Sequence, residues 1–338
     1  MKIHILYDFK RHATGGGTHF LAALKKKWTQ RKVYADDVGD ADVILINSHH
    51  QVEEALRIRQ SFPAKPFIHR IDGPMVLYNF FLDRRDELVK LVGKYLSSGT
   101  VFQSEWSRRE NAKRGIACGE REVVILNSVD EHIFNTRQRS DFSSSRRTRL
   151  IATSWSVNPK KGFDVYQWLD RNLDFSAFEM VFIGRSAVIF ENIRHIPSAT
   201  QEELARELKI SDIYITASQK DPCSNALLEA MACGLPAVAY KDGGHPEIVR
   251  QGGEIFKYAG EIPALLDKIR KNYGAYRQNV RIEPLEETAD KYYKFCQSVY
   301  EASHVGGSQR CQLTSGQYRQ IYAALKWIDF QRHLPFFE

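Results

Sequence analysis

Apolar runs and amphipathic stretches alternate along the chain. In the first half, β-rich apolar runs occupy 2–9, 42–48, 65–72 and 100–104. Between them, apolar positions recur at helical spacing over 20–28, 51–62, 76–97 and 105–114. Strands that alternate with helices in this way predict a parallel sheet covered by helices on both faces.

The alternation stops near the middle of the chain and then restarts. Residues 135–148, NTRQRSDFSSSRRT, are polar, rich in Ser and Arg, and without periodicity, which is typical of a linker. Strand patterns return at 149–156, 178–185, 192–197, 212–218 and 236–240, with helical patterns at 161–170, 202–208 and 225–234.

We therefore predict an α/β protein with two Rossmann-like, doubly wound domains. The predicted parts are an N-terminal domain over 1–135, a linker over 136–148, a second domain over 149–312, and a C-terminal segment over 313–338. This last segment contains an amphipathic helix that could cross back to the first domain. Ligands of doubly wound sheets bind outside the carboxyl ends of the strands, so two facing domains would form a cleft lined by strand-to-helix loops.

The composition is that of an ordinary globular protein, with 338 residues, 43% hydrophobic and 26% charged. No apolar run approaches the roughly 20 residues that a membrane span needs, and we expect a cytoplasmic protein. The five cysteines, Cys118, Cys223, Cys233, Cys296 and Cys311, form no C-x-x-C pair. We expect reduced thiols and no metal site.

Positive charge is concentrated in the first half, where residues 1–140 carry 23 Lys/Arg against 17 Asp/Glu. No nucleic-acid-binding signature accompanies it, so an anionic membrane surface or a phosphate-bearing substrate is the better partner. The stretch KKKW at 25–28, followed by Arg31 and Lys32, favours peripheral membrane contact. The alternative is a basic surface that is simply solvated.

The most informative segment is 221–248, DPCSNALLEAMACGLPAVAYKDGGHPEI. Ser224 or Asn225 can cap a helix whose first amides, with Ala226 among them, suit a phosphate. Glu229 lies one and a half turns inside this helix among apolar residues, an unusual place for an acid. The alternative for Glu229 is an acid that only complements the helix dipole.

This segment resembles the signature of family-4 glycosyltransferases of the GT-B fold. In that family the pattern E-x(7)-E ends in a run like LEAMACGLP and is followed by GG-x-PE. Here Asp221 occupies the first acidic position and Glu229 the second. The resemblance implies that Glu229 binds the ribose hydroxyls of a nucleotide-sugar donor and that Asp221 contacts the donor sugar. Asp221 is one methylene shorter than the family's glutamate.

Further matches follow the family's order along most of the chain. Gly15, Gly16 and Gly17 resemble the N-terminal glycine loop, in which the backbone can approach a ligand closely. His69 in HRIDGP ends a strand where the family often has a histidine near the donor sugar, and Asp72 follows it. The run Asn127–Asp130 resembles the N-G-V-D that closes the first domain, with Ser in place of Gly.

His49 and His50 end another first-domain strand and are candidates for the acceptor side. Each of these histidines, and Asp72, could instead be a structural, hydrogen-bonded residue. The glycines could likewise form a plain strand-to-helix turn.

The departing diphosphate needs cations, since it gains negative charge as the sugar bond breaks. Lys161 is similar to the family's Lys-Gly pair, but Ser156 stands where the family usually has arginine. Gly184 and Arg185 follow a neighbouring strand, and we expect Arg185 to supply the missing charge. Lys160 and Lys220 are the next candidates, and a surface role is the alternative for Arg185.

The resemblance thus implies a retaining, hexosyl-type glycosyltransferase that uses a nucleotide-diphosphate sugar, and we expect it to need no metal cofactor. Surface glycan, lipopolysaccharide or glycoconjugate synthesis would supply a glycan or lipid-linked acceptor. Two alternatives stay open at this point. One is a nucleotide-sugar epimerase or hydrolase on the same fold, and the other is a non-catalytic nucleotide-sugar-binding protein.

Overall fold

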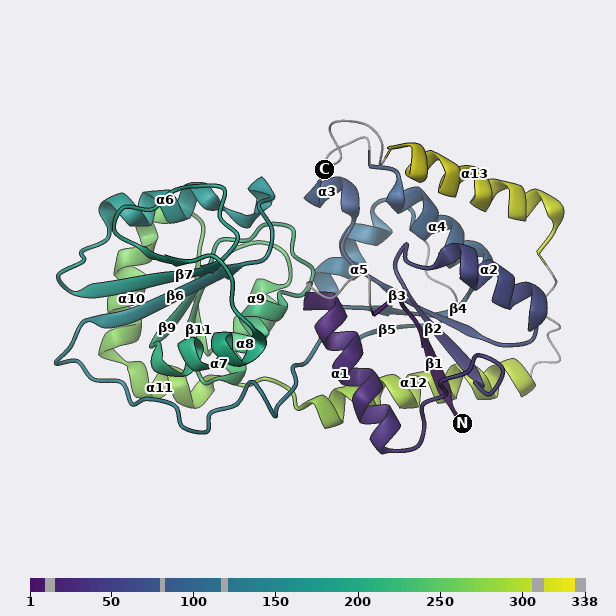
Figure 1. Ribbon diagram of the computed structural model, residues 1–338, viewed down its shortest axis with the longest axis horizontal. Helices are drawn as coiled ribbons and strands as arrows, with labels where there is room; N and C mark the ends of the chain where they lie inside the picture. The colour runs from purple at the N-terminus through teal and green to yellow at the C-terminus, as the bar shows by residue number, and fades with distance from the viewer. Residues whose placement is uncertain (10–15, 80–82, 117–120, 306–312, 332–338) are drawn as a thin grey trace. The chain divides into compact units, whose positions relative to one another are not determined.

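The protein, described by a computed structural model over residues 1–9, 16–79, 83–116, 121–305 and 313–331, forms two compact units. One unit contains the chain up to Leu126, apart from a short stretch that ends at Phe20, and the chain from Glu286 onward. The other contains that stretch and Asn127–Leu285. Each unit has a central parallel sheet with helices on both faces (Figure 1), which confirms the two predicted α/β domains.

The sheet of the first unit has the strand order β1-β2-β3-β4-β5, and every pair is parallel. The strands are β1 (Ile3–Leu6), β2 (Val43–Asn47), β3 (Phe67–Ile71), β4 (Ser97–Phe102) and β5 (Glu122–Val124). A parallel bridge between Ile3 and Tyr34 lies on the other side of β1 from β2. The chain therefore winds outward from β1 in both directions, as a doubly wound sheet does.

Seven helices among the described residues belong largely to this unit. They are α1 (Gly16–Gln30), α2 (Val52–Ser61), α3 (Met75–Tyr78), α4 (Arg85–Tyr95), α5 (Glu105–Ala112), α12 (Leu285–Val305) and α13 (Ser315–Gln331). All five residues of β2 are buried, as expected where helices cover both faces of a parallel sheet.

The sheet of the second unit has the order β11-β10-β9-β6-β7-β8, again wholly parallel. The strands are β6 (Thr148–Ser154), β7 (Phe178–Gly184), β8 (Arg194–Ile196), β9 (Ile213–Thr216), β10 (Ala237–Tyr240) and β11 (Gly253–Phe256). The helices are η1 (Pro159–Lys161), α6 (Phe163–Asn172), α7 (Gln201–Ile210), α8 (Asn225–Ala232), α9 (His245–Val249), η2 (Ala259–Glu261), α10 (Ile262–Lys271) and α11 (Tyr273–Asn279).

One predicted helix differs from the structure, and two strands of the structure were not predicted. The helix expected over 76–97 is divided into α3 and α4, because Asp83 accepts a hydrogen bond from the Arg85 amide and starts a new helix there. Strands β5 and β11 are absent from the prediction. The first has only three residues, although it begins the apolar run 123–126, and the second begins with glycine, which weakens a strand pattern.

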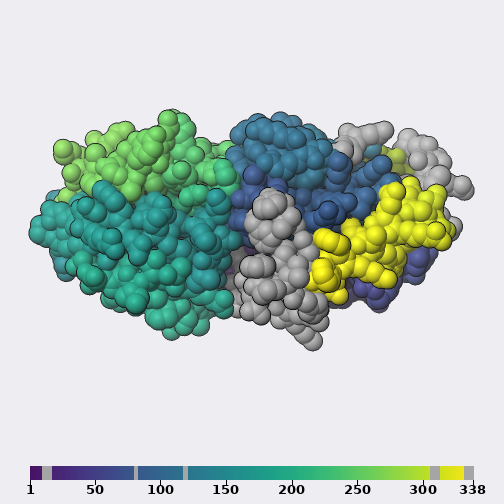
Figure 2. All heavy atoms as spheres, turned by 90° about the horizontal axis from the view of Figure 1, so that it is seen from above, coloured from purple at the N-terminus to yellow at the C-terminus, as the bar shows by residue number. Residues whose placement is uncertain are grey.

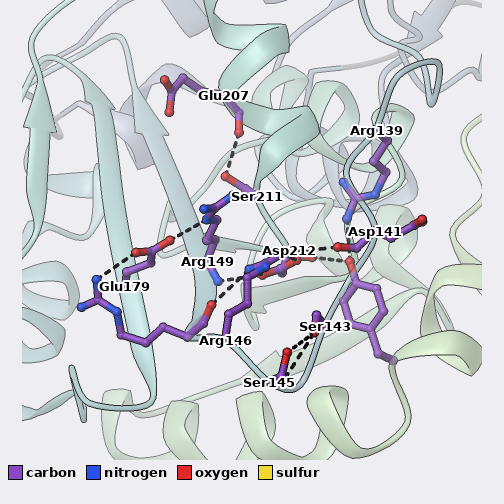
Figure 3. A network of polar contacts seen from close by, with 12 residues as sticks. Arg139, Asp141, Ser143, Ser145, Arg146, Arg149, Glu179, Glu207, Ser211 and Asp212 are labelled. Carbon is purple, nitrogen blue, oxygen red and sulfur yellow. Dashed lines mark hydrogen bonds and ion pairs between the residues drawn. The ribbon is translucent and has the colours of Figure 1, made fainter.

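The predicted linker, 136–148, is part of the second unit and packs on it. Arg146 makes a two-pronged ion pair with the buried Asp212, at 2.7 and 2.9 Å (Figure 3). Arg139 donates to the Cys233 carbonyl and to the Tyr273 hydroxyl. The arginines that made this stretch look like a solvated linker thus anchor it, and the chain passes from the first unit to the second at Leu126 and Asn127 instead.

The chain also returns to the first unit earlier than predicted, at Glu286 rather than at 313. Helix α12 packs against α1, where the Trp28 indole donates to the Ala289 carbonyl at 3.3 Å. Glu286 pairs with Lys27 at 2.9 Å and also with Arg31. Part of the basic run predicted to face a membrane is therefore neutralised inside the unit.

Helix α13 packs on α4 of the first unit and lies on the molecular surface, in yellow in Figure 2. Ile321 and Ile328 point into the same apolar cluster as Leu88 and Val92. Trp327 and Phe330 on the same helix are exposed. Among the described helices, none combines the length and the apolar character that a membrane crossing would require.

Candidate functional site

Three loops meet at the carboxyl edge of the second sheet, and two glycines allow them to meet. Gly162, with φ +76°, leaves no room for a side chain, since a Cβ would lie 2.4 Å from the Ala217 carbonyl oxygen. Gly243, with φ +62°, is equally close to the Asp221 carbonyl, at 2.1 Å. The loops after β6, β9 and β10 are therefore in direct contact, which only glycine permits at these two points.

Lys161, Ser218 and Asp221 form a polar cluster where these loops meet. The Lys161 Nζ lies 3.3 Å from the Ser218 Oγ and 3.5 Å from the Asp221 Oδ2. Ser218 Oγ is also 3.5 Å from Asp221 Oδ2. The two charged side chains are 21% and 16% exposed, so a ligand can reach them. At these distances the hydrogen bonds within the cluster are weak.

The other candidate cations differ in how they are paired. Lys220 is held by Asp242, with its Nζ 3.0 Å from a carboxylate oxygen and its amide bonded to the same group. Arg185 follows Gly184 at the end of β7, and its amide donates to the Ser154 carbonyl at 2.7 Å. Its side chain is exposed and has no ion pair within the described part of the chain. Lys160 is half-buried, and its carbonyl accepts the Gln219 amide.

Glu229 lies in α8 and is 5% exposed. Burial raises the pKa of its carboxyl group from 4.5 to about 8. No hydrogen-bond donor among the residues that the structure describes reaches this carboxyl group. A largely buried carboxyl group without donors is costly to the fold, and a ligand that brings donors would reduce this cost.

The start of α8 contains three further residues that were predicted to contact the nucleotide sugar. Ser224 caps the helix by accepting from the Leu227 amide at 3.4 Å, as predicted. Asn225 instead uses its side-chain oxygen to accept from Asn127, at 3.1 Å. Ala226 is half-buried, and the first turn contains no acid. The positive end of the helix dipole is therefore open to an anion.

His245 is a site residue that the sequence analysis did not single out, although it lies within the GGHPE run. It is completely buried, and its Nδ1 lies 3.0 Å from the Tyr240 carbonyl oxygen. Because a carbonyl only accepts, Nδ1 carries the proton and Nε2 is an acceptor, which has no partner among the described residues. Burial lowers the pKa of this imidazole, opposed by the charge of Asp221.

The candidates of the first unit are more deeply built into the fold. His69 is completely buried in β3, where its Nε2 lies 2.9 Å from the Ser48 carbonyl and burial lowers its pKa to about 4. Asp72 accepts from Arg70 at 3.2 Å and also from Gln103. The contacts of Asp72 correspond to the structural alternative, whereas the buried His69 Nδ1 has no partner among the described residues.

His49 and His50 stack on each other with ring centroids 4.3 Å apart, and His50 meets the ring of Tyr7 at 5.3 Å. This aromatic group lies at the carboxyl ends of β1 and β2. Of the glycine loop, Gly16 and Gly17 begin α1, and a Cβ on Gly17 would meet nothing within 4 Å. Gly15 lies outside the described residues, as do Cys118 and Cys311.

No group of three or more metal-binding side chains occurs among the described residues. The sequence contains one Asp-x-Asp run, Asp40 to Asp42. It lies at the amino end of β2, where Asp42 accepts from the Lys2 amide at 2.7 Å. The run is thus at the edge of the sheet opposite to the one where ligands bind.

Residues 185–277, which lie in the second unit, match the family described as glycosyl transferases group 1. N-acetyl-alpha-D-glucosaminyl L-malate synthase of Bacillus anthracis is 40% identical over 144 residues, which cover 38% of this chain and 38% of that protein. A probable sucrose-phosphate synthase of Thermosipho melanesiensis is 24% identical over 199 residues, covering 52% of this chain and 45% of that protein. The matched stretches span less than half of either relative.

Solved structures extend the likeness to both units. Anabaena Alr3699/HepE, in complex with UDP and glucose, has a TM-score of 0.62 at 14% identity, covering 90% of this chain and 100% of that one. Sucrose-phosphate synthase from Thermosynechococcus elongatus has a TM-score of 0.56 at 15% identity, covering 93% and 80%. At such identities the likeness concerns the fold, which is that of GT-B glycosyltransferases.

Proposed function

We propose that the protein is a retaining glycosyltransferase that transfers a sugar from a nucleotide-diphosphate sugar to an acceptor hydroxyl. The observation that carries the proposal is Glu229, a carboxyl group buried without donors in the domain that matches glycosyl transferases group 1. A ribose offers two neighbouring hydroxyl donors, which are the partners this group lacks. The resemblance noted above assigns the same ligand to this position.

The groups near Glu229 are assigned to the diphosphate and the sugar of the nucleotide-sugar donor. The open N-terminus of α8 and the Nζ of Lys161 supply positive charge for the diphosphate. Asp221, beside Lys161 at 3.5 Å, accepts hydroxyls of the donor sugar. His245 does not reach solvent and holds the turn after β10 in place. Arg185 supplies a second cation from the adjacent loop.

In the proposed reaction, the bond between the anomeric carbon and the phosphate oxygen breaks, and the electron pair leaves with the nucleoside diphosphate. The acceptor oxygen bonds to the same face of that carbon, which retains the configuration. Its proton passes to an oxygen of the leaving phosphate, so no protein nucleophile is needed. Lys161 and Arg185 stabilise the charge that develops on the diphosphate, and we propose that this makes a metal ion unnecessary.

The proposal includes a glycan or lipid-linked acceptor at the first unit and contact with an anionic membrane from the cytoplasmic side. The exposed Trp327 and Phe330 would supply apolar contact in that case. Sedimentation with vesicles of anionic and of neutral lipids tests this part separately from catalysis.

A thermal-shift screen of nucleotide sugars, followed by calorimetry, tests the donor site. At a hundred times its dissociation constant, the right donor should stabilise the fold by about 2.7 kcal/mol. Product analysis then separates the alternatives. Consumption of donor without an acceptor indicates a hydrolase or epimerase, and binding without turnover indicates a binding protein. Turnover that is lost in EDTA and restored by manganese contradicts the metal-free mechanism, and failure of every nucleotide sugar to bind contradicts the function.

A further inference from the structure

A cavity of about 440 Å³ lies at the amino edge of the second sheet, away from the donor site. Its walls come from the first residues of β6, β7 and β8 and from the end of α7. The seven-residue strand β6 separates it from the carboxyl edge by about 20 Å. The cavity is therefore a separate place in the unit, and its size is that of a small-molecule site.

Three arginines and two glutamates give this cavity its polar wall. Arg149 donates through Nε to one oxygen of Glu179 at 2.6 Å, and Arg147 donates to the other at 3.1 Å. Arg194 donates through Nη2 to Glu207 at 2.9 Å. Figure 3 shows Arg149 bonded to Glu179 in the network that also holds Arg146. Three cations face two carboxylates, so the wall has an excess positive charge.

The ion pairs with Glu179 and Glu207 hold the guanidinium groups in place, and some of their N–H donors remain without an acceptor in the described part of the chain. The two Nη groups of Arg149, and the Nε and Nη1 groups of Arg194, have no acceptor among the residues that the structure describes. Arg149 is 40% exposed and Arg194 62% exposed, so a ligand can reach both. Preoriented guanidinium forks suit the oxygens of a phosphate, which they can bind in pairs.

The rest of the lining is apolar. Met180 and Val181 of β7 are buried, Phe175 is half-buried, and Ile210 at the end of α7 is 40% exposed. A wholly polar ion would leave this surface in water, whereas a ligand with an apolar or planar body would cover it. The carboxylates of Glu179 and Glu207 would repel a ligand that carries more than one anionic group.

We propose that this cavity is a second ligand site, which binds a small molecule with one phosphate group on an apolar or planar body. Phosphate oxygens accept from Arg149 and Arg194, while the body of the ligand lies against Phe175 and Ile210. The site does not depend on the proposed glycosyltransferase activity, because it shares no residue with the donor site.

Calorimetric titration of the full chain with phenyl phosphate and with inorganic phosphate tests the proposal. Phenyl phosphate should bind more tightly than inorganic phosphate. Arg149→Ala and Arg194→Gln should each weaken it by about tenfold, since each removes a charge-assisted bond. Ile210→Ser should weaken phenyl phosphate and leave inorganic phosphate unchanged.

Arg108→Ala is the matched control, because Arg108 is also ion-paired, with Glu105 and Glu122, and is 44% exposed. It should bind both probes as the parent does. Binding of phenyl phosphate weaker than about 10 mM, or equal losses in Arg108→Ala and Arg149→Ala, would overturn the proposal. Competition by the donor nucleotide would also overturn it, by placing the probe in the donor site.

Discussion

The polar residues at the carboxyl edges of the two sheets differ in how many hydrogen-bond and ion-pair partners they have within the protein. In the first unit, Asp72 receives Arg70 and Gln103 on one oxygen and Asn47 on the other, and its carbonyl receives Ser107 and Asn111. In the second unit, Glu229 receives no hydrogen bond from the described residues, Arg185 has no ion pair among them, and the Lys161 Nζ lies 3.3 Å from Ser218 and 3.5 Å from Asp221.

A difference of this kind is expected between polar groups that stabilise the fold and polar groups that bind a ligand. A buried polar group that is satisfied inside the protein stabilises the fold, whereas an unsatisfied one costs stability until a ligand satisfies it. The raised pKa of Glu229 is the physical sign of that cost. Glu229 in the second unit therefore has the surroundings expected of a ligand-binding group, whereas Asp72 is satisfied within the first unit. The first unit is not fully satisfied, because the buried His69 Nδ1 has no partner among the described residues.

Among these substitutions, the removal of Asp72 should have the largest effect, a loss of folding stability. Asp72→Ala leaves the completely buried Arg70 without its carboxylate, which should cost about 3 kcal/mol of unfolding free energy. Scanning calorimetry of parent and variant measures this loss. Asp72→Asn keeps the acceptor oxygen and should lose less.

Donor binding should be unchanged in Asp72→Ala, because the donor groups lie in the other unit. A loss below about 1 kcal/mol would show that Asp72 is not part of a structural network and would restore it to the acceptor site.

Arg185→Ala should lower kcat/KM by about a hundredfold, or 2.7 kcal/mol, with little change in thermal stability. Its exposed guanidinium has no ion pair to lose in the described part of the chain, so under the proposed function its charge is available to the diphosphate. Lys220→Ala is the matched control, since Asp242 already neutralises that lysine. Arg185→Lys should restore part of the rate. Turnover of Arg185→Ala within about threefold of the parent would refute the role.

Glu229→Gln should weaken donor binding by about 1.5 to 3 kcal/mol, because an amide forms no charge-assisted bonds to hydroxyls. Between its ordinary value of 4.5 and about 8, the folded protein keeps a proton on Glu229 that the unfolded chain releases. Stability contributed by that proton falls as pH rises through this window, and the glutamine variant lacks this fall.

Urea unfolding of parent and variant at pH 5 and pH 8 measures the difference, which should grow in favour of the variant at pH 8. Donor binding at pH 7 should release protons, seen by calorimetry in buffers of different ionisation heat. Equal donor affinity of Glu229→Gln and parent would remove Glu229 from the site.

Local patterns predicted the helix that carries Glu229 and the cap of that helix, because such elements are set by neighbouring residues. The sequence placed Glu229 in a buried helix, with Ser224 as its cap. It could not show that Asp242 pairs with Lys220, since 22 residues separate them. The anchoring of Arg146 by Asp212, 66 residues away, is equally absent from the local pattern, and so the linker was misplaced.

The smallest expected effect comes from restoring the arginine that the family pattern has at position 156. Ser154 and Gly184 are register partners in β6 and β7, and the Arg185 amide bonds to the Ser154 carbonyl. The loops that carry Ser156 and Arg185 therefore leave the sheet side by side, and under the proposed function a cation from either loop would face the same diphosphate. In the parent, Ser156→Arg should change kcat/KM by less than about threefold, because Arg185 already supplies the charge. In the Arg185→Ala background it should recover about tenfold, or 1.4 kcal/mol. A double-mutant cycle measures this coupling. If the two substitutions act additively, the cations serve different groups, and the comparison of the two edges would then rest on Glu229 and Lys161 alone.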